Sequence, residues 1–196
     1  MRPTSAGQSA LLLLDVIHVL NERQIPYAIV GAFAASFYGM VRASLDADAI
    51  ISIYASEDAL ALCAGLRAQG LVVEHHWGDQ DDPIAAVINI QDQFHNRVDL
   101  LMGIRGMKPE IFSRTVDAKF MEATIKIVSP EDFIALKVFA GSPKDIQDVI
   151  GVLQVSTEKI NLKFLKELTL QYGPRCAQKL ESLLKEFPLE SERYRQ

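Results

Sequence analysis

The stretch from Val30 to Asp48, V-G-A-F-A-A-S-F-Y-G-M-V-R-A-S-L-D-A-D, contains the features that decide the fold. It begins within a short apolar run, Tyr27–Gly31, which predicts a buried strand closed by glycine. Residues 32–38 then predict a short helix that stops at the next glycine. The stretch ends on two aspartates that begin a second strand, residues 45–53, in which side chains alternate between two faces. The sequence therefore predicts a strand, a helix and a strand that places both carboxylates on one face.

The segments on either side of this stretch predict a mixed α/β core followed by helices. Residues 10–20 and a segment capped by Ser56 predict helices. Further strands are expected at residues 71–77, 84–90, 97–102 and, with weaker signals, within 116–128. From Ser129 onward, capping residues followed by proline begin helices. We therefore predict an α/β core over residues 1–128 and a C-terminal helical region, residues 129–196, that packs on it.

The composition is that of a folded chain of ordinary size. The 196 residues are 49% apolar and 23% charged, with a net charge of −5, so disorder is not expected. Cys63 and Cys176 are the only cysteines, too few for a disulfide framework or a four-cysteine zinc site. No apolar run approaches the roughly 18 residues of a membrane span, and Ala10–Leu14 is too short for the core of a signal peptide. These features predict a cytoplasmic protein without a membrane segment.

Charge is distributed unevenly along the chain. Residues 1–155 carry 12 Lys and Arg against 19 Asp and Glu, whereas residues 156–196 carry 8 against 6. A protein that binds long nucleic acid through phosphate contacts alone is usually basic, so any such contact is expected at a local patch. Lys159, Lys163 and Lys166 form a candidate stripe on one helix, for which a solvated face is the alternative.

Asp46 and Asp48 carry the sharpest chemical signal. A second D-x-D, Asp79 to Asp81, lies in a polar turn where acidic side chains are expected. Asp46 and Asp48 instead begin an apolar strand, where two carboxylates on one face repel each other and lose hydration. Residues i and i+2 of a strand lie about 7 Å apart and point the same way, so both carboxylates can lean over one or two divalent cations. The alternative is a solvated strand end.

Asp99 adds a third acid, in the apolar sequence R-V-D-L-L. If its strand pairs beside residues 45–53, Asp99 lies about 5 Å from the D-x-D pair between Cβ atoms. Three carboxylates with two Mg²⁺ ions leave a slightly positive site that an anionic triphosphate can enter. The alternative is that Asp99 pairs with Arg97 or a helix terminus. Upstream, the turn at Gly31 offers backbone N–H groups to phosphate, although glycine is also ordinary turn chemistry there.

Together these motifs resemble the signature of the DNA polymerase β-like nucleotidyltransferase superfamily: a glycine turn, then D-x-D, then a third acid on a later strand. Ser129–Lys137 (S-P-E-D-F-I-A-L-K) and Lys144–Val149 (K-D-I-Q-D-V) resemble the helical region of its minimal bacterial branch, which includes AbiEii-type toxins. The resemblance covers about residues 10–155. It implies a small mixed β-sheet flanked by helices and transfer of a nucleoside monophosphate from an NTP to an acceptor, with release of pyrophosphate.

The resemblance also implies roles for individual residues. The phosphate turn would be Gly31 and Ala32, both metals would be held by Asp46 and Asp48, and Asp99 would complete one metal site and act as base. The metal implied is Mg²⁺, as two ions, with Mn²⁺ as a substitute. Other candidates for phosphate contact are Arg42, Ser44 and Lys137. Asp145 matches an acid that recurs in the branch and Asp148 lies one helical turn later, with capping or bracing of the helices as the alternative for both. The implied partners are an NTP, a tRNA end or protein hydroxyl as acceptor and, for a toxin, an antitoxin protein.

Two positions depart from the pattern, and alternatives stay open. Ala32 stands where Gly or Ser is usual, which removes a hydroxyl but keeps the backbone N–H, and Ala49 replaces a bulkier residue. We favour an active enzyme over a catalytically inactive nucleotidyltransferase fold that only binds a nucleotide or a partner. A metal-dependent phosphohydrolase would use the same carboxylates, but it explains the strand–glycine–helix turn less well.

Overall fold

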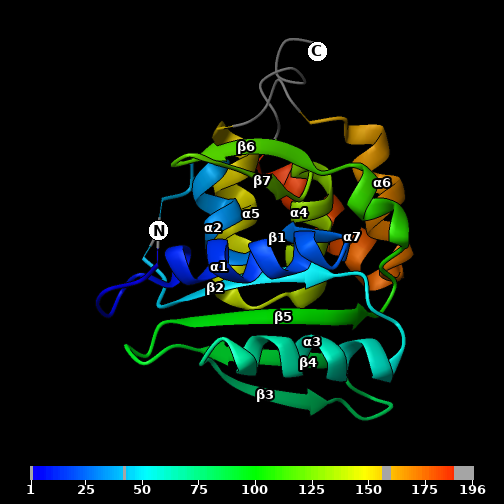
Figure 1. Cartoon of the computed structure of the whole chain (residues 1–196). Helices are drawn as coiled ribbons and strands as arrows, with labels where there is room; N and C mark the ends of the chain where they lie inside the picture. Colours follow the sequence, from blue (N-terminus) through cyan, green and yellow to red (C-terminus); the bar gives the residue numbers. More distant parts are fainter. Residues whose placement is uncertain (1, 42, 156–159, 188–196) are drawn as a thin grey trace.

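The computed structural model describes residues 2–41, 43–155 and 160–187 (Figure 1). One seven-stranded sheet runs through the protein, in the strand order β3-β4-β5-β2-β1-β7-β6. Its strands are β1 (Tyr27–Ile29), β2 (Asp46–Ile51), β3 (Val72–Trp77), β4 (Ile84–Gln91), β5 (Arg97–Ile104), β6 (Val116–Phe120) and β7 (Ala123–Ile127). Because β2 is parallel to β5 but antiparallel to β1, the sheet is mixed. The predicted α/β fold is confirmed.

Helices flank the sheet on both faces. The first face carries α1 (Ser9–Glu22) and α3 (Ser56–Ala68), which lie in front of the sheet in Figure 1. The opposite face carries α2 (Gly31–Phe37), α4 (Pro130–Ala140), α5 (Pro143–Val155), α6 (Leu162–Gln171) and α7 (Pro174–Glu186), and a 3₁₀ helix, η1 (Pro109–Ser113), follows β5. Within the described ranges, no helix combines the length and the apolar character needed to cross a membrane.

The alternation of β2 sends its two kinds of side chain to opposite faces of the sheet. Ala47 and Ala49 are buried on the face that α1 packs against. Asp46 and Asp48 are half-buried on the other face, because side chains of a strand alternate between faces. The small side chain of Ala49 is therefore a core position under a helix, and its departure from the superfamily pattern leaves both carboxylates in place.

Two of the three predicted serine caps are present. The hydroxyl of Ser129 accepts the backbone N–H three residues later at 3.1 Å, at the start of α4, and Ser142 does the same at 3.2 Å for α5. The predicted cap at Ser56 is wrong: Ala55 holds the cap position and makes no side-chain hydrogen bond. Two acidic side chains in the first turn of α3 offset the positive end of the helix dipole instead.

Candidate active site

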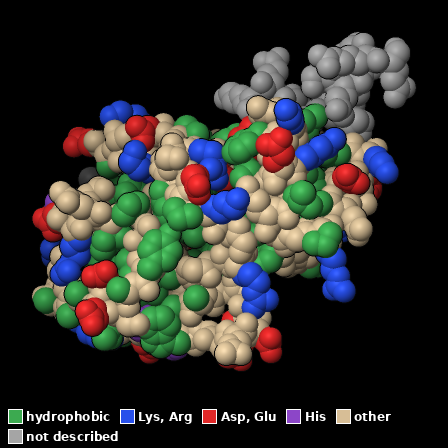
Figure 2. Space-filling model, turned by 90° about the vertical axis from the view of Figure 1, so that its right-hand side faces the viewer, with side chains coloured by type: hydrophobic (Ala, Val, Ile, Leu, Met, Phe, Trp, Pro, Cys, Tyr) green, Lys and Arg blue, Asp and Glu red, His purple; other side chains and the backbone are tan. Residues whose placement is uncertain are grey.

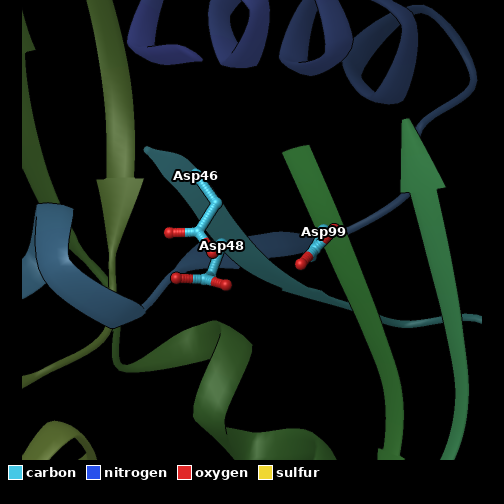
Figure 3. A group of neighbouring side chains, drawn as sticks. All are labelled: Asp46, Asp48 and Asp99. Carbon is cyan, nitrogen blue, oxygen red and sulfur yellow. The ribbon is translucent and has the colours of Figure 1, made fainter. Parts of the chain in front are cut away.

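Three carboxylates from two neighbouring parallel strands converge on the face opposite α1. In the register of β2 and β5, Asp48 lies directly beside Asp99, as the sequence predicts. One ligand oxygen from each of Asp46, Asp48 and Asp99 lies within 4.8 Å of the other two, and Figure 3 shows all three side chains on the same side of the sheet. Oxygen atoms at this spacing can share a divalent cation, because Mg²⁺ prefers carboxylate oxygens and water as ligands.

Gly31 presses the start of α2 against the second of these carboxylates. Its φ of +65° is a left-handed conformation, and a Cβ built on Gly31 would lie 1.9 Å from Oδ2 of Asp48. The backbone N–H of Val30 also donates to the carbonyl oxygen of Asp48 at 3.0 Å. Only glycine fits this position, both for its conformation and for the space left by the carboxylate. The glycine in the sequence therefore serves the contact between the turn and the acids as well as the turn itself.

Two polar side chains that the sequence analysis did not single out for function hold Asp99. Arg97 donates from Nε to Oδ1 at 2.8 Å and from Nη2 to Oδ2 at 2.9 Å, and Asn89 donates from Nδ2 to Oδ1 at 2.7 Å. The hydrogen bond to Asp99 raises the pKa of the Arg97 guanidinium, which the charges of Asp46 and Asp48 raise further. Asp99 therefore both joins the acidic cluster and pairs with Arg97. The two roles that the sequence offers as alternatives for Asp99 are both present.

The signal for these two residues lies in strand alternation. Arg97 precedes Asp99 by two positions, so both side chains fall on one face of β5. Asn89 is the residue of β4 directly opposite Asp99, and it interrupts the apolar sequence I-N-I. A polar residue between two apolar ones can be recognised from sequence, but its partner follows only from the strand order.

The remaining predicted phosphate contacts occupy different surroundings. Ser44 donates from its hydroxyl to Oδ1 of Asp46 at 2.5 Å, so it orients a carboxylate of the cluster. Ala32 is buried in the first turn of α2. Arg42 lies outside the described residues, as does Lys159 of the predicted basic stripe, whereas the other two lysines of that stripe are exposed on α6.

Lys137 lies on α4, beside the glycine turn, but its ammonium group already has two anionic partners. Nζ lies 2.6 Å from Oδ1 of Asp145 and 3.0 Å from Oδ2 of Asp148, both on α5. Burial alone would raise the pKa of the Asp145 carboxyl, but hydrogen bonds from Lys137 and Ser142 leave it below its ordinary value. This cluster joins α4 to α5, which favours the bracing role for the two aspartates.

The cluster of three acids fits a divalent cation by its chemistry. Asp46, Asp48 and Asp99 supply three negative charges, of which the guanidinium of Arg97 offsets one. Carboxylates this close repel one another, and a cation bound among them relieves that repulsion. Among the described residues this is the one group of at least three side chains that could hold a metal ion, and all of its members are aspartates.

Comparison with known proteins assigns the chain to the nucleotidyltransferase class. The chain belongs to the family described as nucleotidyl transferase of unknown function (DUF2204), whose profile matches residues 10–186. The protein is thus a nucleotidyltransferase, as the sequence predicts. No curated protein sequence matches the chain. Membership of the branch that includes AbiEii-type toxins stays a prediction.

Solved structures share the fold at low sequence identity. An antigenic nucleotidyltransferase-like protein from Paracoccidioides brasiliensis superposes with a TM-score of 0.60 at 17% identity, over 96% of this chain and 94% of that one. The antibiotic-resistance factor ANT(2'')-Ia gives a TM-score of 0.57 at 14% identity, over 91% and 95%. The lincosamide antibiotic adenylyltransferase LnuA gives 0.50 at 11% identity, over 78% and 99%. These likenesses show a common architecture along nearly the whole length of each relative.

Proposed function

We propose that the protein transfers a nucleoside monophosphate from an NTP to a hydroxyl acceptor, in a reaction that depends on Mg²⁺ held by Asp46, Asp48 and Asp99. The observation that carries this proposal is the convergence of these carboxylates within 4.8 Å of one another. It is supported by the start of α2, which Gly31 packs directly against Asp48. Few structural purposes favour three acids on one half-buried face, because their mutual repulsion is unfavourable without a cation.

The described side chains supply binding, orientation and a proton acceptor for this reaction. When bound, the divalent ions supply charge stabilisation for the phosphates and the attacking oxygen. Gly31 and Ala32 offer backbone N–H groups to the phosphate tail, and Ser44 keeps Asp46 oriented through their hydrogen bond. The oxygen of the acceptor hydroxyl bonds to the α-phosphorus, and the bond to pyrophosphate breaks. Asp99 accepts the proton that the hydroxyl loses.

Arg97 and Asn89 fix the position of that proton acceptor. Together they give the carboxylate of Asp99 three hydrogen bonds, which hold it in one orientation beside Asp48. A fixed geometry of this kind matters because catalytic groups act efficiently only when they are already oriented towards the reacting atoms. The predicted contact between Lys137 and the triphosphate requires its ammonium group to leave or share Asp145 and Asp148.

The acceptor and the biological role are finer parts of the proposal. A tRNA end or a protein hydroxyl as acceptor, a toxin role and an antitoxin partner stay predictions from the resemblance. The face of the molecule at which β2, β3 and β5 end carries interspersed basic and acidic side chains around apolar ones (Figure 2). Asp46 and Asp99 lie near the opposite ends of β2 and β5, where these strands begin, so the charges of this face do not decide the acceptor.

The test is label transfer with a control chosen from the same sequence. Each α-³²P-labelled NTP is incubated with the protein, Mg²⁺ or Mn²⁺, and total RNA, total protein or small-molecule extract. Metal-dependent transfer by the wild type should disappear in the Asp46→Asn/Asp48→Asn variant. It should persist in Asp79→Asn/Asp81→Asn, which changes the D-x-D of the exposed turn.

Each remaining pattern of results identifies an alternative. NTP binding that survives Asp46→Asn/Asp48→Asn, with no transfer by the wild type under any condition, would support a binding module instead. Metal-dependent release of phosphate from NTP without labelling of any acceptor would support the phosphohydrolase.

A further inference from the structure

An apolar pocket of about 210 Å³ lies between the sheet and α4, next to the acidic cluster. One wall begins at Gly31, whose backbone touches Asp48, and continues along β5 at Leu101 and Ile104. The opposite wall is formed by α4, including Phe139 and Ala140. Leu101 follows Asp99 by two residues on the same strand, so the pocket extends from the strand that carries the proposed base.

The charges around this pocket exclude a phosphate group as its occupant. Lys137 is the single charged side chain among the described residues that line it, and its ammonium group is paired with Asp145 and Asp148. The two carboxylates neutralise the charge of the ammonium group, so an anion gains little by entering. The phosphate tail of an NTP is therefore expected at the acidic cluster and at Gly31, which forms the edge of the pocket next to Asp48.

The apolar lining also disfavours a nucleobase. The ring nitrogens and exocyclic groups of a base lose hydrogen bonds to water when they are buried, and each costs about 1–3 kcal/mol when it gains no partner. The pocket walls are dominated by aliphatic and aromatic carbon. Its volume is also below the roughly 300–1,000 Å³ of pockets for drug-sized ligands, which suits one compact ring system.

We propose that this pocket is the acceptor subsite and that it binds the uncharged apolar ring of a small hydroxyl compound. This inference rests on the proposed function. With the ring against Leu101 and Phe139, the hydroxyl lies towards Asp99, where its oxygen bonds to the α-phosphorus of the NTP. The hydroxyl proton passes to the Asp99 carboxylate, and pyrophosphate leaves with the electrons of the broken bond.

The experiment fills the pocket and measures two ligands separately. Cyclohexanol and benzyl alcohol are titrated into wild type, Ala140→Trp, which changes an exposed residue of the pocket lining, and the matched control Ala68→Trp, which changes an exposed residue of α3. Saturation-transfer NMR should show saturable binding by the wild type with a dissociation constant of about 1 mM, a weak affinity typical of a small fragment. Binding should weaken at least about tenfold, or about 1.4 kcal/mol, in Ala140→Trp and stay unchanged in Ala68→Trp.

The second ligand is ATP with Ca²⁺, measured by calorimetry on the same three proteins. ATP affinity should be equal in all three, whereas transfer of labelled AMP to benzyl alcohol with Mg²⁺ should be lost in Ala140→Trp alone. Absence of saturable alcohol binding by the wild type overturns the inference. So does an equal loss of ATP affinity in Ala140→Trp, which marks a nucleobase pocket, or label transfer to RNA that Ala140→Trp leaves intact.

Failure of the proposed function gives a different pattern. Alcohol binding that is sensitive to Ala140→Trp, combined with no metal-dependent transfer from any NTP, contradicts the nucleotidyl transfer chemistry assigned to Asp46, Asp48 and Asp99. In that case the pocket binds apolar alcohols, but they are not acceptors, and the acceptor assignment fails together with the reaction.

Discussion

The protein contains two arginine–aspartate pairs with nearly the same geometry and different surroundings. Arg97 meets Asp99 through two hydrogen bonds of 2.8 and 2.9 Å, and Arg114 meets Asp132 through two of 2.8 Å. The side chains of Arg97 and Asp99 are 50% and 11% exposed, whereas those of Arg114 and Asp132 are 25% and 2% exposed. Similar hydrogen-bond geometry therefore occurs at an open site beside two further carboxylates and at a closed site between helices.

The neighbours of each pair show what it does. Asp132 also accepts a hydrogen bond from Ser129 at the start of α4, and Arg114 stacks over the ring of Phe164 on α6. That pair ties the segment after η1 to two helices. Asp99 lies beside two further carboxylates instead. A buried pair between helices is structural, whereas a half-exposed pair beside further carboxylates provides a place for a cation.

The largest expected effect is on transfer activity, and it distinguishes Asp99 from Asp132. Asp99→Asn should lower kcat/KM for nucleotidyl transfer by about 10³-fold, since it removes the proposed metal ligand and proton acceptor, roles that together contribute several kcal/mol. Its free energy of unfolding should change by less than about 1 kcal/mol, because one of three repelling charges is lost. Labelled transfer and urea unfolding measure both quantities. Asp132→Asn, at the other arginine–aspartate pair, is the control. If Asp99→Asn keeps an activity per folded molecule within tenfold of the wild type, the catalytic role proposed for Asp99 is contradicted.

The second effect separates the two arginines by stability. Arg114→Met should lower the free energy of unfolding by about 3 kcal/mol, because it leaves the buried carboxylate of Asp132 without its partner. Arg97→Met should cost about 1 kcal/mol, as expected for a half-exposed pair. Mg²⁺ should recover the loss in Arg97→Met by binding the freed carboxylates, and it should leave Arg114→Met unchanged. Equal Mg²⁺ responses in urea unfolding would show that the two pairs do not differ in this way.

The third effect isolates the contact between the glycine turn and the acids. Gly31 and Gly70 both have positive φ, but a Cβ at Gly31 would collide with Asp48, whereas one at Gly70 has nothing within 4 Å. Alanine at either position should cost about 1–2 kcal/mol from backbone strain. Only Gly31→Ala should also displace the carboxylate and lower transfer activity. Activity losses of the same size in both variants would remove the special role of the Gly31–Asp48 contact.

The convergence of the three acids was predictable from local patterns. Asp46 and Asp48 interrupt one face of an apolar strand, and Asp99 interrupts another, so each strand shows a polar residue where burial is expected. Placing them together required the two strands to be neighbours, which the spacing of motifs in the superfamily supplied and which the parallel pair β2–β5 bears out. Periodicity alone does not give strand order, because it reports the faces of one element at a time.

The partners of the charged side chains were harder to predict. Asn89 meets Asp99 across two adjacent strands, and Lys137 meets Asp145 and Asp148 across two helices. Each contact depends on packing between elements, and the sequence specifies which face a side chain takes but not what faces it. The family resemblance therefore suggested a phosphate contact for Lys137, whereas its ammonium group pairs with two carboxylates of the next helix.

The smallest effect tests that helix–helix cluster through its pH dependence. Because the pKa of Asp145 is lowered in the folded protein, its ionised form stabilises the fold at pH values above the unfolded pKa of about 3.9. That contribution is lost as the pH falls through the lower folded pKa. Asp145→Asn should therefore cost about 1–2 kcal/mol at pH 7, the usual contribution of hydrogen bonds to a charged group. The difference from wild type should shrink as the pH falls below about 4.

Urea unfolding of wild type and Asp145→Asn across this pH range measures the difference directly, and comparing the two proteins at each pH cancels the titration of all other groups. Asp81→Asn, in the exposed turn, should change stability by less than about 0.5 kcal/mol throughout. A difference for Asp145→Asn that grows in acid would mean that the carboxylate destabilises the junction between α4 and α5. Lys137 would then be available to the phosphates of a bound NTP, since its ion pairs would contribute little to the fold.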